Sequence, residues 1–428
     1  MLLSLTVQAQ SIEDARKLYS EGKYAEALPV FEKALKTASK SAAKKMTDAY
    51  LSMGNIYYSL YEFEKSAEAY SHYADLLVQD KKTAEAAEIA PLIERSERAA
   101  RMLSRCEDIQ IIDSVVVDKK NFLNTYRLSG ESGHLENQNG RIVYENPLRD
   151  KRYYAGKKEG GGDRIYSEIK LQNEWTDKME LTVPSDSLAN DDYPFVLPDG
   201  LTIYYASTGK GSIGGYDLFI TRYNLNNDTW LAPSQMGMPF NSIANDYMMA
   251  IDEINNIGYF ATDRFQTEGK VVVYTFIPNE ETISLQTEEE QALISRAKIV
   301  SIKDSWKPNS NYSAYLEDVR KSIRQEQMIS TRDFSFAMND NTVYYILNDF
   351  KNDAAKQAFL KSKELKESID HLEEELDELR LEFAQSGKSK QQSMRSNILS
   401  KEERLQTLLN QYKQFVKNTR NFELKANK

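Results

Sequence analysis

The sequence is poor in the residues that build disulfides and metal centres. Cys106 is the only cysteine, so no internal disulfide can form, and we expect it to be a small buried apolar residue. The three histidines, His72, His134 and His371, are too scattered along the chain to suggest a zinc site. The sequence therefore predicts no metal site and no cofactor held by these residue types.

The chain also lacks an excess of positive charge. Its net charge is −10 over 428 residues. A general nucleic-acid binder needs a basic surface, so we expect no nucleic acid among the partners. Beyond the N-terminus no run of 18 apolar residues occurs, which predicts no transmembrane segment in the mature chain. The length allows two or three domains with sizeable cores.

The first ten residues, MLLSLTVQAQ, have some features of a secretion signal. Met1 to Val7 is a short apolar run, and Val7-Gln8-Ala9 has the small-x-small pattern of a signal-peptidase site. A positively charged segment is missing before the run, so residues 1–10 are interpreted as the remnant of a signal peptide, with a frayed terminus as the alternative. No cysteine follows the run, so no lipoprotein anchor is expected. The expected compartment is the periplasm of a Gram-negative cell.

Residues 11–106 have the periodicity of paired helices. Small and aromatic residues recur at one mutual spacing in two stretches that are 39 residues apart, namely Tyr24, Ala27, Phe31 and Ala34, and then Phe63, Ser66, Tyr70 and Tyr73. Over about 65 residues this pattern resembles the tetratricopeptide family, whose period is about 34 residues, with the surplus in the Ser39–Lys45 linker. Residues 83–106 are expected to form a capping helix.

The resemblance implies a concave surface that binds extended peptides through the first helix of each pair. Mapped onto this sequence, the partner-binding positions are Arg16, Tyr19, Asn55 and Tyr58. Asn55 stands where many family members hold a peptide backbone amide. Leu51 and Ser52 replace the basic residues of the subgroup that grips a C-terminal carboxylate, so we do not expect that mode of recognition. The alternative is that the two repeats only pack against the next domain.

Residues 107–350 change character and predict antiparallel strands. Short runs of Tyr, Ile and Val alternate with clusters of Gly, Asn and Asp. VPSDSLANDDYPF from Val183 matches MPFNSIANDYMM from Met238, and Trp175 and Trp230 share the same spacing of 55. Aromatic pairs precede Ala155, Ala206 and Ala261 in three successive units, and FAMNDNTVYYIL at 336–347 looks like a degenerate fourth. A period of about 50 residues with four strands per unit predicts a β-propeller.

The unit from Tyr193 to Trp230 carries a family resemblance. Its segments PDG, IYYAS and GGYDLF are similar to the TolB-type, WD40-like propeller repeat. The resemblance implies that the Asp-Gly turn joins the first two strands and that the double glycine turns the second into the third. We expect about four blades, the last completed by Ile109–Asp118. Residues 286–330 interrupt the pattern and predict inserted helices around a strand at Lys298–Lys303 and a turn at Trp306–Pro308.

Residues 353–428 predict a coiled coil. Leucine and isoleucine recur with heptad spacing in two stretches separated by SGKSKQQS, first at Leu365, Ile369, Leu372, Leu376, Leu379 and Phe383, and then at Ile398, Leu405, Leu409, Tyr412 and Val416. Two helices joined by a polar turn favour an antiparallel hairpin. A parallel homodimer through the same seams is the alternative.

The motifs that suggest a cofactor site or a catalytic nucleophile lack the sequence context that each requires. Gly209, Gly211 and Gly214 have the spacing of a dinucleotide-binding loop, but the segment after them alternates like a strand rather than opening a helix. We therefore predict a hairpin turn in which glycine supplies positive φ. Ser212 lacks the preceding glycine of a nucleophile elbow, because Lys210 stands there.

Acidic residues recur with the repeat. Asp191, Asp192 and Asp246 suggest the carboxylates of a propeller glycosidase, but their repetition favours turn capping, with a calcium site as a weaker alternative. The sequence therefore predicts no catalytic residue and no enzyme.

Taken with the resemblances, the three segments predict a non-catalytic scaffold or adaptor that is periplasmic or associated with the outer membrane. The expected partners are other envelope proteins or peptides. The alternatives are a propeller glycosidase and a glycan-binding sensor whose coiled coil transmits the signal.

Overall fold

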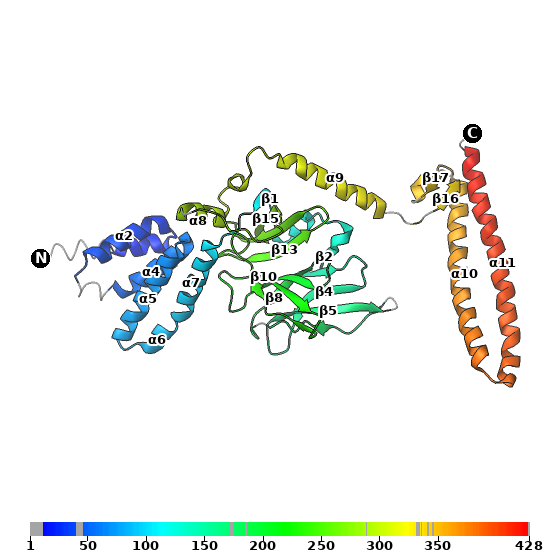
Figure 1. The fold of residues 1–428 in the computed structure, drawn as a ribbon, viewed down its shortest axis with the longest axis horizontal. Coiled ribbons are helices and arrows are strands. Elements are labelled where there is room, and N and C mark those ends of the chain that lie inside the picture. The colour runs from blue at the N-terminus through cyan, green and yellow to red at the C-terminus, as the bar shows by residue number, and fades with distance from the viewer. Residues whose placement is uncertain are drawn as a thin grey trace. The chain divides into compact units, whose positions relative to one another are not determined.

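A computed structural model describes residues 12–39, 46–171, 174–184, 186–287, 289–330, 334, 336–339, 342–344 and 346–426. Contacts between residues divide the chain into two units, 1–323 and 324–428. The predicted order of N-terminal helices, antiparallel strands and long C-terminal helices is confirmed (Figure 1). The predicted signal remnant at 1–10 and residues 40–45 of the predicted linker lie outside the described residues.

The first unit begins with a stack of short helices. Residues 12–20 are helical and are followed by α2 (Tyr24–Thr37), α4 (Thr47–Leu60), α5 (Phe63–Gln79), α6 (Thr83–Ala87) and α7 (Ala90–Ser104). Small residues let α4 and α5 approach closely, since a Cβ added at Gly54 would lie 2.5 Å from Cε1 of Tyr70. Ser66 of α5 also donates a hydrogen bond to the carbonyl of Gly54 at 2.8 Å.

Three antiparallel sheets follow the helices. The first contains β2 (His134–Gln138), β3 (Arg141–Glu145), β4 (Lys151–Lys157), β5 (Asp163–Leu171), β6 (Glu174–Trp175) and β7 (Met179–Glu180). The second contains β8 (Asp191–Val196), β9 (Thr202–Ser207), β10 (Asp217–Asn224), β11 (Thr229–Trp230) and β12 (Ser234–Gln235). The third contains β13 (Asp246–Asp252), β14 (Ile257–Thr262), β15 (Lys270–Ile277) and β1 (Gln110–Asp118).

The repeat seen in the sequence is a repeat in strand register. Each sheet places one aromatic residue opposite another on its two neighbouring middle strands, at Tyr154 and Tyr166, Tyr205 and Phe219, and Phe260 and Tyr274. One continuous hydrophobic core, which includes Phe195 and Phe260, draws residues from all three sheets. The three units therefore share one local structure, which the sequence repeat correctly predicted.

The predicted fourth blade is wrong. Strand β1 does not complete a sheet with residues 336–344 but pairs along its length with β15 of the third sheet. Its residues Ile111 and Ile112 are buried in the common core, which explains the pairing. The strands β16 (Phe336–Asn339) and β17 (Thr342–Tyr344) instead form a two-stranded hairpin in the second unit.

The β16–β17 hairpin lies within the segment 107–350 predicted as a propeller but packs with the residues that follow it. Phe336 packs against Phe350 and Phe359, with ring centroids 6.2 and 5.0 Å away, so this hairpin shares its core with the C-terminal helices.

The predicted insertion at 286–330 is helical but contains no strand at Lys298–Lys303. Helix α8 (Glu290–Lys298) ends there, the 3₁₀ helix η4 (Ile302–Ser305) follows, and α9 (Tyr312–Ser330) comes next. Hydrogen bonds tie this segment to the outer strand β1. The Ser305 hydroxyl accepts a hydrogen bond from the amide of Ile111 at 2.9 Å, and the Trp306 indole donates one to the carbonyl of Ile111 at 2.8 Å.

Two long helices dominate the second unit. After the 3₁₀ helix η5 (Leu347–Asp349), α10 (Asp353–Gln385) and α11 (Lys388–Ala426) follow each other with a two-residue connection. The predicted seam of α10 is buried at Leu365, Ile369, Leu372 and Leu376. Near the other end of the pair, the buried carboxylate of Glu423 accepts hydrogen bonds from the amides of Lys351 and Asn352 at 2.7 and 3.1 Å. The helices are therefore antiparallel partners within one chain.

Candidate binding sites

Two of the predicted partner-binding residues meet on the helical surface. The Asn55 side-chain amide donates a hydrogen bond to the Tyr19 hydroxyl at 2.9 Å, and the Tyr70 hydroxyl donates one to the Asn55 carbonyl oxygen at 2.6 Å. Tyr19 and Asn55 are half-buried, while Tyr70 is fully buried. These bonds use one donor and one acceptor of the amide, which leaves Asn55 one N–H and one lone pair. We call these three residues the Asn55 array.

Arg16 is held by other residues of the chain. Its guanidinium makes a two-point contact with Asp48, at 2.8 and 3.0 Å, and a further ion pair with Glu13. The hydrogen bond that Arg16 donates to the Asp48 carboxylate raises the pKa of Arg16. The structure therefore places Arg16 in an ion pair that joins the first helix to α4.

Tyr58 is not exposed for a partner, so its predicted role is corrected. It is 7% exposed, and its hydroxyl donates a hydrogen bond to the carbonyl of Ile213 at 2.5 Å. The Arg95 guanidinium lies 4.4 Å from its ring centroid. Tyr58 belongs to an apolar cluster that joins the N-terminal helices to loops of the second sheet, at Ile213 and Met238, and to α8 at Ala297. Packing of the helices against the next part of the chain, the alternative drawn from the sequence, therefore occurs in the structure.

The repeated acidic residues are engaged by the fold. Asp191 is buried, accepts a hydrogen bond from Ser207 at 2.6 Å and lies 3.5 Å from the guanidinium of Arg164. Asp246 is fully buried and lies 2.8 Å from the guanidinium of Arg264. These carboxylates join strands and sheets together, and Asp246 also caps a turn by accepting a hydrogen bond from the Ser242 amide at 2.6 Å. Burial raises the pKa of the neighbouring Asp192 to about 6.

The glycine loop connects two strands, as predicted, but the predicted reason for its glycines is wrong. Gly209, Gly211 and Gly214 follow β9 and precede β10, and φ is not positive at any of them. Gly214 is required because the chain passes close to the next sheet, where an added Cβ would lie 1.9 Å from the carbonyl oxygen of Ala244. Positive φ occurs instead at Gly200, in the turn between β8 and β9.

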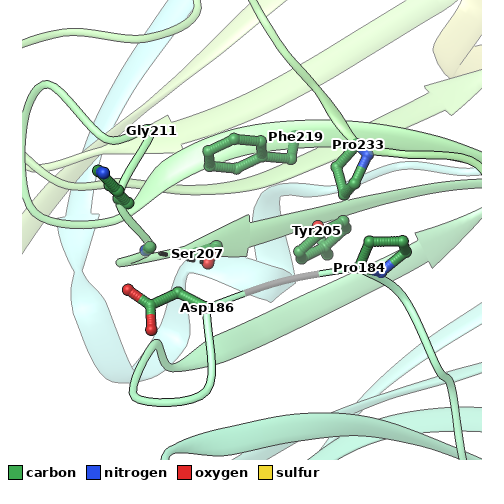
Figure 2. A pocket seen from close by; sticks show the side chains of 9 residues that line it. Pro184, Asp186, Tyr205, Ser207, Gly211, Phe219 and Pro233 are labelled. Carbon is green, nitrogen blue, oxygen red and sulfur yellow. Dashed lines mark hydrogen bonds between the residues drawn. The ribbon is translucent and has the colours of Figure 1, made fainter.

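A pocket of about 480 Å³ lies on the second sheet beside this loop. Figure 2 shows the rings of Tyr205 and Phe219 side by side on neighbouring strands, with Asp186, Ser207 and Gly211 toward one end and two prolines toward the other, Pro184 and Pro233. The two rings are stacked, with centroids 5.9 Å apart and an interplanar angle of 27°. We call this the second-sheet pocket.

A larger pocket of about 800 Å³ lies between the first and third sheets. Its lining comes from the β2–β3 hairpin, from Tyr193 and from the 3₁₀ helix η2 (Lys119–Thr125), which follows β1. The Lys119 ammonium lies 3.8 Å from the ring centroid of Tyr247, and burial lowers its pKa. The ring of Tyr193 lies 5.5 Å from that of Tyr247 in a tilted arrangement and meets that of Tyr216 edge to face at 5.9 Å. We call this the seam pocket.

Within the described ranges, no group of three or more His, Cys, Asp or Glu side chains is placed to hold a metal ion. Cys106 is buried as expected, and burial raises its pKa to about 12. None of the helices searched, which are those of the described residues, is both long and apolar enough to cross a membrane.

The sequence did not single out either pocket. The signal for the second-sheet pocket was present, because aligning the repeats at Ala155, Ala206 and Ala261 also aligns the aromatic residues that line it. The seam pocket had no such signal, since Lys119 and Tyr247 are far apart in the chain. Comparisons with protein-family models, curated proteins and solved structures find no match to this chain.

Proposed function

We propose that the protein is a non-catalytic scaffold that binds other proteins or peptides of the Gram-negative envelope, in the periplasm or in association with the outer membrane. In this proposal the helices are tetratricopeptide repeats and the three sheets are blades of a TolB-type propeller. The single observation that carries the proposal is the Asn55 array on the helical surface.

The Asn55 array is suited to holding an extended peptide. Hydrogen bonds from Tyr70 and to Tyr19 fix the orientation of the Asn55 amide, so little side-chain entropy is lost when a ligand binds. The remaining N–H and lone pair match the carbonyl and amide of one peptide backbone unit. The ring of Tyr24 lies 5.6 Å from that of Tyr19 and extends the aromatic surface beside the amide.

The state of the acidic residues also favours a binding role over a hydrolytic one. A glycosidase needs two carboxyl groups that face a shared cleft. Asp191 and Asp246 are buried and each is paired with its own arginine, Arg164 and Arg264. In these positions the carboxylates stabilise the sheets.

A peptide selection tests the proposal. A displayed library of envelope-protein peptides is selected on the full chain, and the affinities of the enriched peptides are measured by calorimetry. We expect Asn55→Ala to weaken binding by about tenfold. The substitution removes the two hydrogen bonds between the Asn55 side chain and the backbone of the bound peptide, each of about 0.5–1.5 kcal/mol. The control is Asn226→Ala, in an exposed turn of the second sheet. Enriched peptides that bind Asn55→Ala as well as the original chain would refute the proposal.

The seam pocket supports a second candidate function, glycan binding. The Tyr193 ring, the lysine ammonium groups and the nearby amides of Asn121 and Asn137 are groups that recognise sugar rings and hydroxyls. Soluble envelope oligosaccharides should then raise the melting temperature of the chain, and Tyr193→Ala should abolish that rise. If no oligosaccharide raises it, this candidate is excluded.

A further inference from the structure

The second-sheet pocket lies over a structure that occurs three times in the molecule. The stacked pair Tyr205 and Phe219 occupies the same register as Tyr154 and Tyr166 in the first sheet. The centroids of those rings are 6.4 Å apart. In the third sheet the corresponding rings are Phe260 and Tyr274, with centroids 5.1 Å apart.

In the two other sheets the chain covers this aromatic pair with its own cations. Lys178 lies 4.4 Å from the ring centroid of Tyr166, and the guanidinium of Arg141 lies 4.6 Å from that of Tyr154. In the third sheet the guanidinium of Arg264 lies 5.7 Å from the centroid of Phe260. Among the residues that the structure describes, no cation lies over Tyr205 or Phe219, and the pocket is found there instead.

Gly209 stands at the position of Arg264. The Gly209 amide donates to Ser207 at 3.1 Å, just as the Arg264 amide donates to Thr262 at 3.2 Å. The residues that precede them match as well, since Thr208 and its counterpart each donate a backbone hydrogen bond to an asparagine carbonyl, at 3.1 and 3.0 Å. The two backbones are therefore equivalent, and the second sheet lacks only the arginine side chain.

The fold tolerates this omission because another residue supplies the charge. In the third sheet Arg264 neutralises the buried Asp246. In the second sheet the equivalent carboxylate, Asp191, is neutralised by Arg164, which comes from the first sheet. Asp191 therefore keeps a charge partner although position 209 is glycine. The space over the two rings is left open.

We propose that the second-sheet pocket receives the side chain of an arginine from a partner protein, in the manner of Arg264 in the third sheet. This inference rests on the proposed scaffold function and adds a second point of contact, away from the Asn55 array. A planar guanidinium stacks on aromatic rings and donates in the plane to a carboxylate. Tyr205 supplies the ring, and Asp186 at the exposed end supplies a carboxylate.

The pocket is large enough to admit one long side chain. Its volume of about 480 Å³ is at the lower end of ligand sites. Lys210 also lines the pocket and carries a positive charge, so we expect recognition to depend on stacking as well as on charge.

The test uses the full chain and the tripeptide Ac-Gly-Arg-Gly-NH₂, with binding followed by saturation-transfer NMR. A matched peptide with citrulline in place of arginine has the same shape but no charge. We expect the arginine peptide to bind about tenfold more tightly, since a desolvated cation–π contact and a charge-assisted hydrogen bond are lost with citrulline. Equal binding of the two peptides, or no binding of the arginine peptide at millimolar concentration, overturns the inference.

Variants at Gly209 locate the binding. Gly209→Arg should fill the pocket with the chain's own guanidinium and weaken binding of the arginine tripeptide by about tenfold. Gly209→Ala is the matched control, because the nearest atoms to its Cβ would be Ser207 Oγ at 3.3 Å, Ala189 Cβ at 3.5 Å and Asp186 Cβ at 3.9 Å. Should Gly209→Arg fail to fold, judged by tryptophan fluorescence, Asp186→Asn takes its place with the same expected direction.

A third variant separates this inference from the proposed function. Asn55→Ala should leave binding of the arginine tripeptide unchanged. If Asn55→Ala abolishes it, the tripeptide binds the helical surface and the inference is wrong. If the Asn55 array fails in the peptide selection while the tripeptide still responds to Gly209→Arg, the proposed function fails at the helices and the pocket stands.

Discussion

Arg264 and Asp246 form an ion pair in the interior of the third sheet, with side-chain exposures of 1% and 0%. Arg264→Met removes one partner and leaves a buried carboxylate without compensation, which costs about 3–5 kcal/mol. The change is measured by urea unfolding followed by tryptophan fluorescence. The three tryptophans, Trp175, Trp230 and Trp306, all lie in the first unit and report on it alone.

Lys158 gives a matched control for Arg264, because it follows Ala155 by three residues as Arg264 follows Ala261. Its ion pair with Glu180 is partly exposed, with side-chain exposures of 47% and 27%. Lys158→Met should therefore cost no more than about 1 kcal/mol. Similar losses in the two variants would contradict the assignment of the Arg264 pair as a buried structural element.

Asp217 makes stability depend on pH. Burial, together with the nearby Asp246, raises its pKa to about 8, against an ordinary value of about 3.9. Between these values the folded state binds more protons than the unfolded state, so the free energy of unfolding falls as pH rises from 5 to 8. Asp217→Asn should flatten this fall, as measured by urea midpoints at both pH values. The exposed Asp228→Asn should keep it, and an unchanged slope in Asp217→Asn would count against the prediction.

At the scale of elements, the contact between α4 and α5 depends on a missing side chain. Alanine is better than glycine by about 1 kcal/mol in an isolated helix. Gly54→Ala should nevertheless destabilise the pair by about 1–3 kcal/mol, because its Cβ would lie 2.5 Å from the Tyr70 ring. Hydrogen exchange of peptides from 47–79 should accelerate, and Tyr70→Leu in the same chain should partly restore protection. Slower exchange in Gly54→Ala would show that propensity outweighs the clash.

At the scale of the whole molecule, the two units have separate cores. The aromatic cluster of Phe336, Phe350 and Phe359 belongs entirely to the second unit, and the seam of α10 is buried against α11. Residues 324–428 expressed alone should therefore unfold cooperatively and sediment as a monomer. Ile369→Ala should destabilise this fragment by about 2–4 kcal/mol, whereas the exposed Leu381→Ala should not. A concentration-dependent dimer would instead support the parallel homodimer allowed by the sequence.

Much of the local structure was determined by the sequence alone. Hydrophobic periodicity predicted the helix pairs and the long C-terminal helices, and the repeat of aromatic pairs predicted strands in common register, because these features depend on residues close together in the chain.

Only the tertiary structure decided which partner each segment takes. Ile109–Asp118 has the composition of an outer strand, but its pairing with β15 rather than with 336–344 depends on contacts across 150 residues or more. Burial of Tyr58 also depends on a distant segment. The helical pattern cannot distinguish it from an exposed residue, but in the structure its hydroxyl bonds to Ile213. Apolar burial is non-directional, so a pattern predicts that a face is covered and leaves open what covers it.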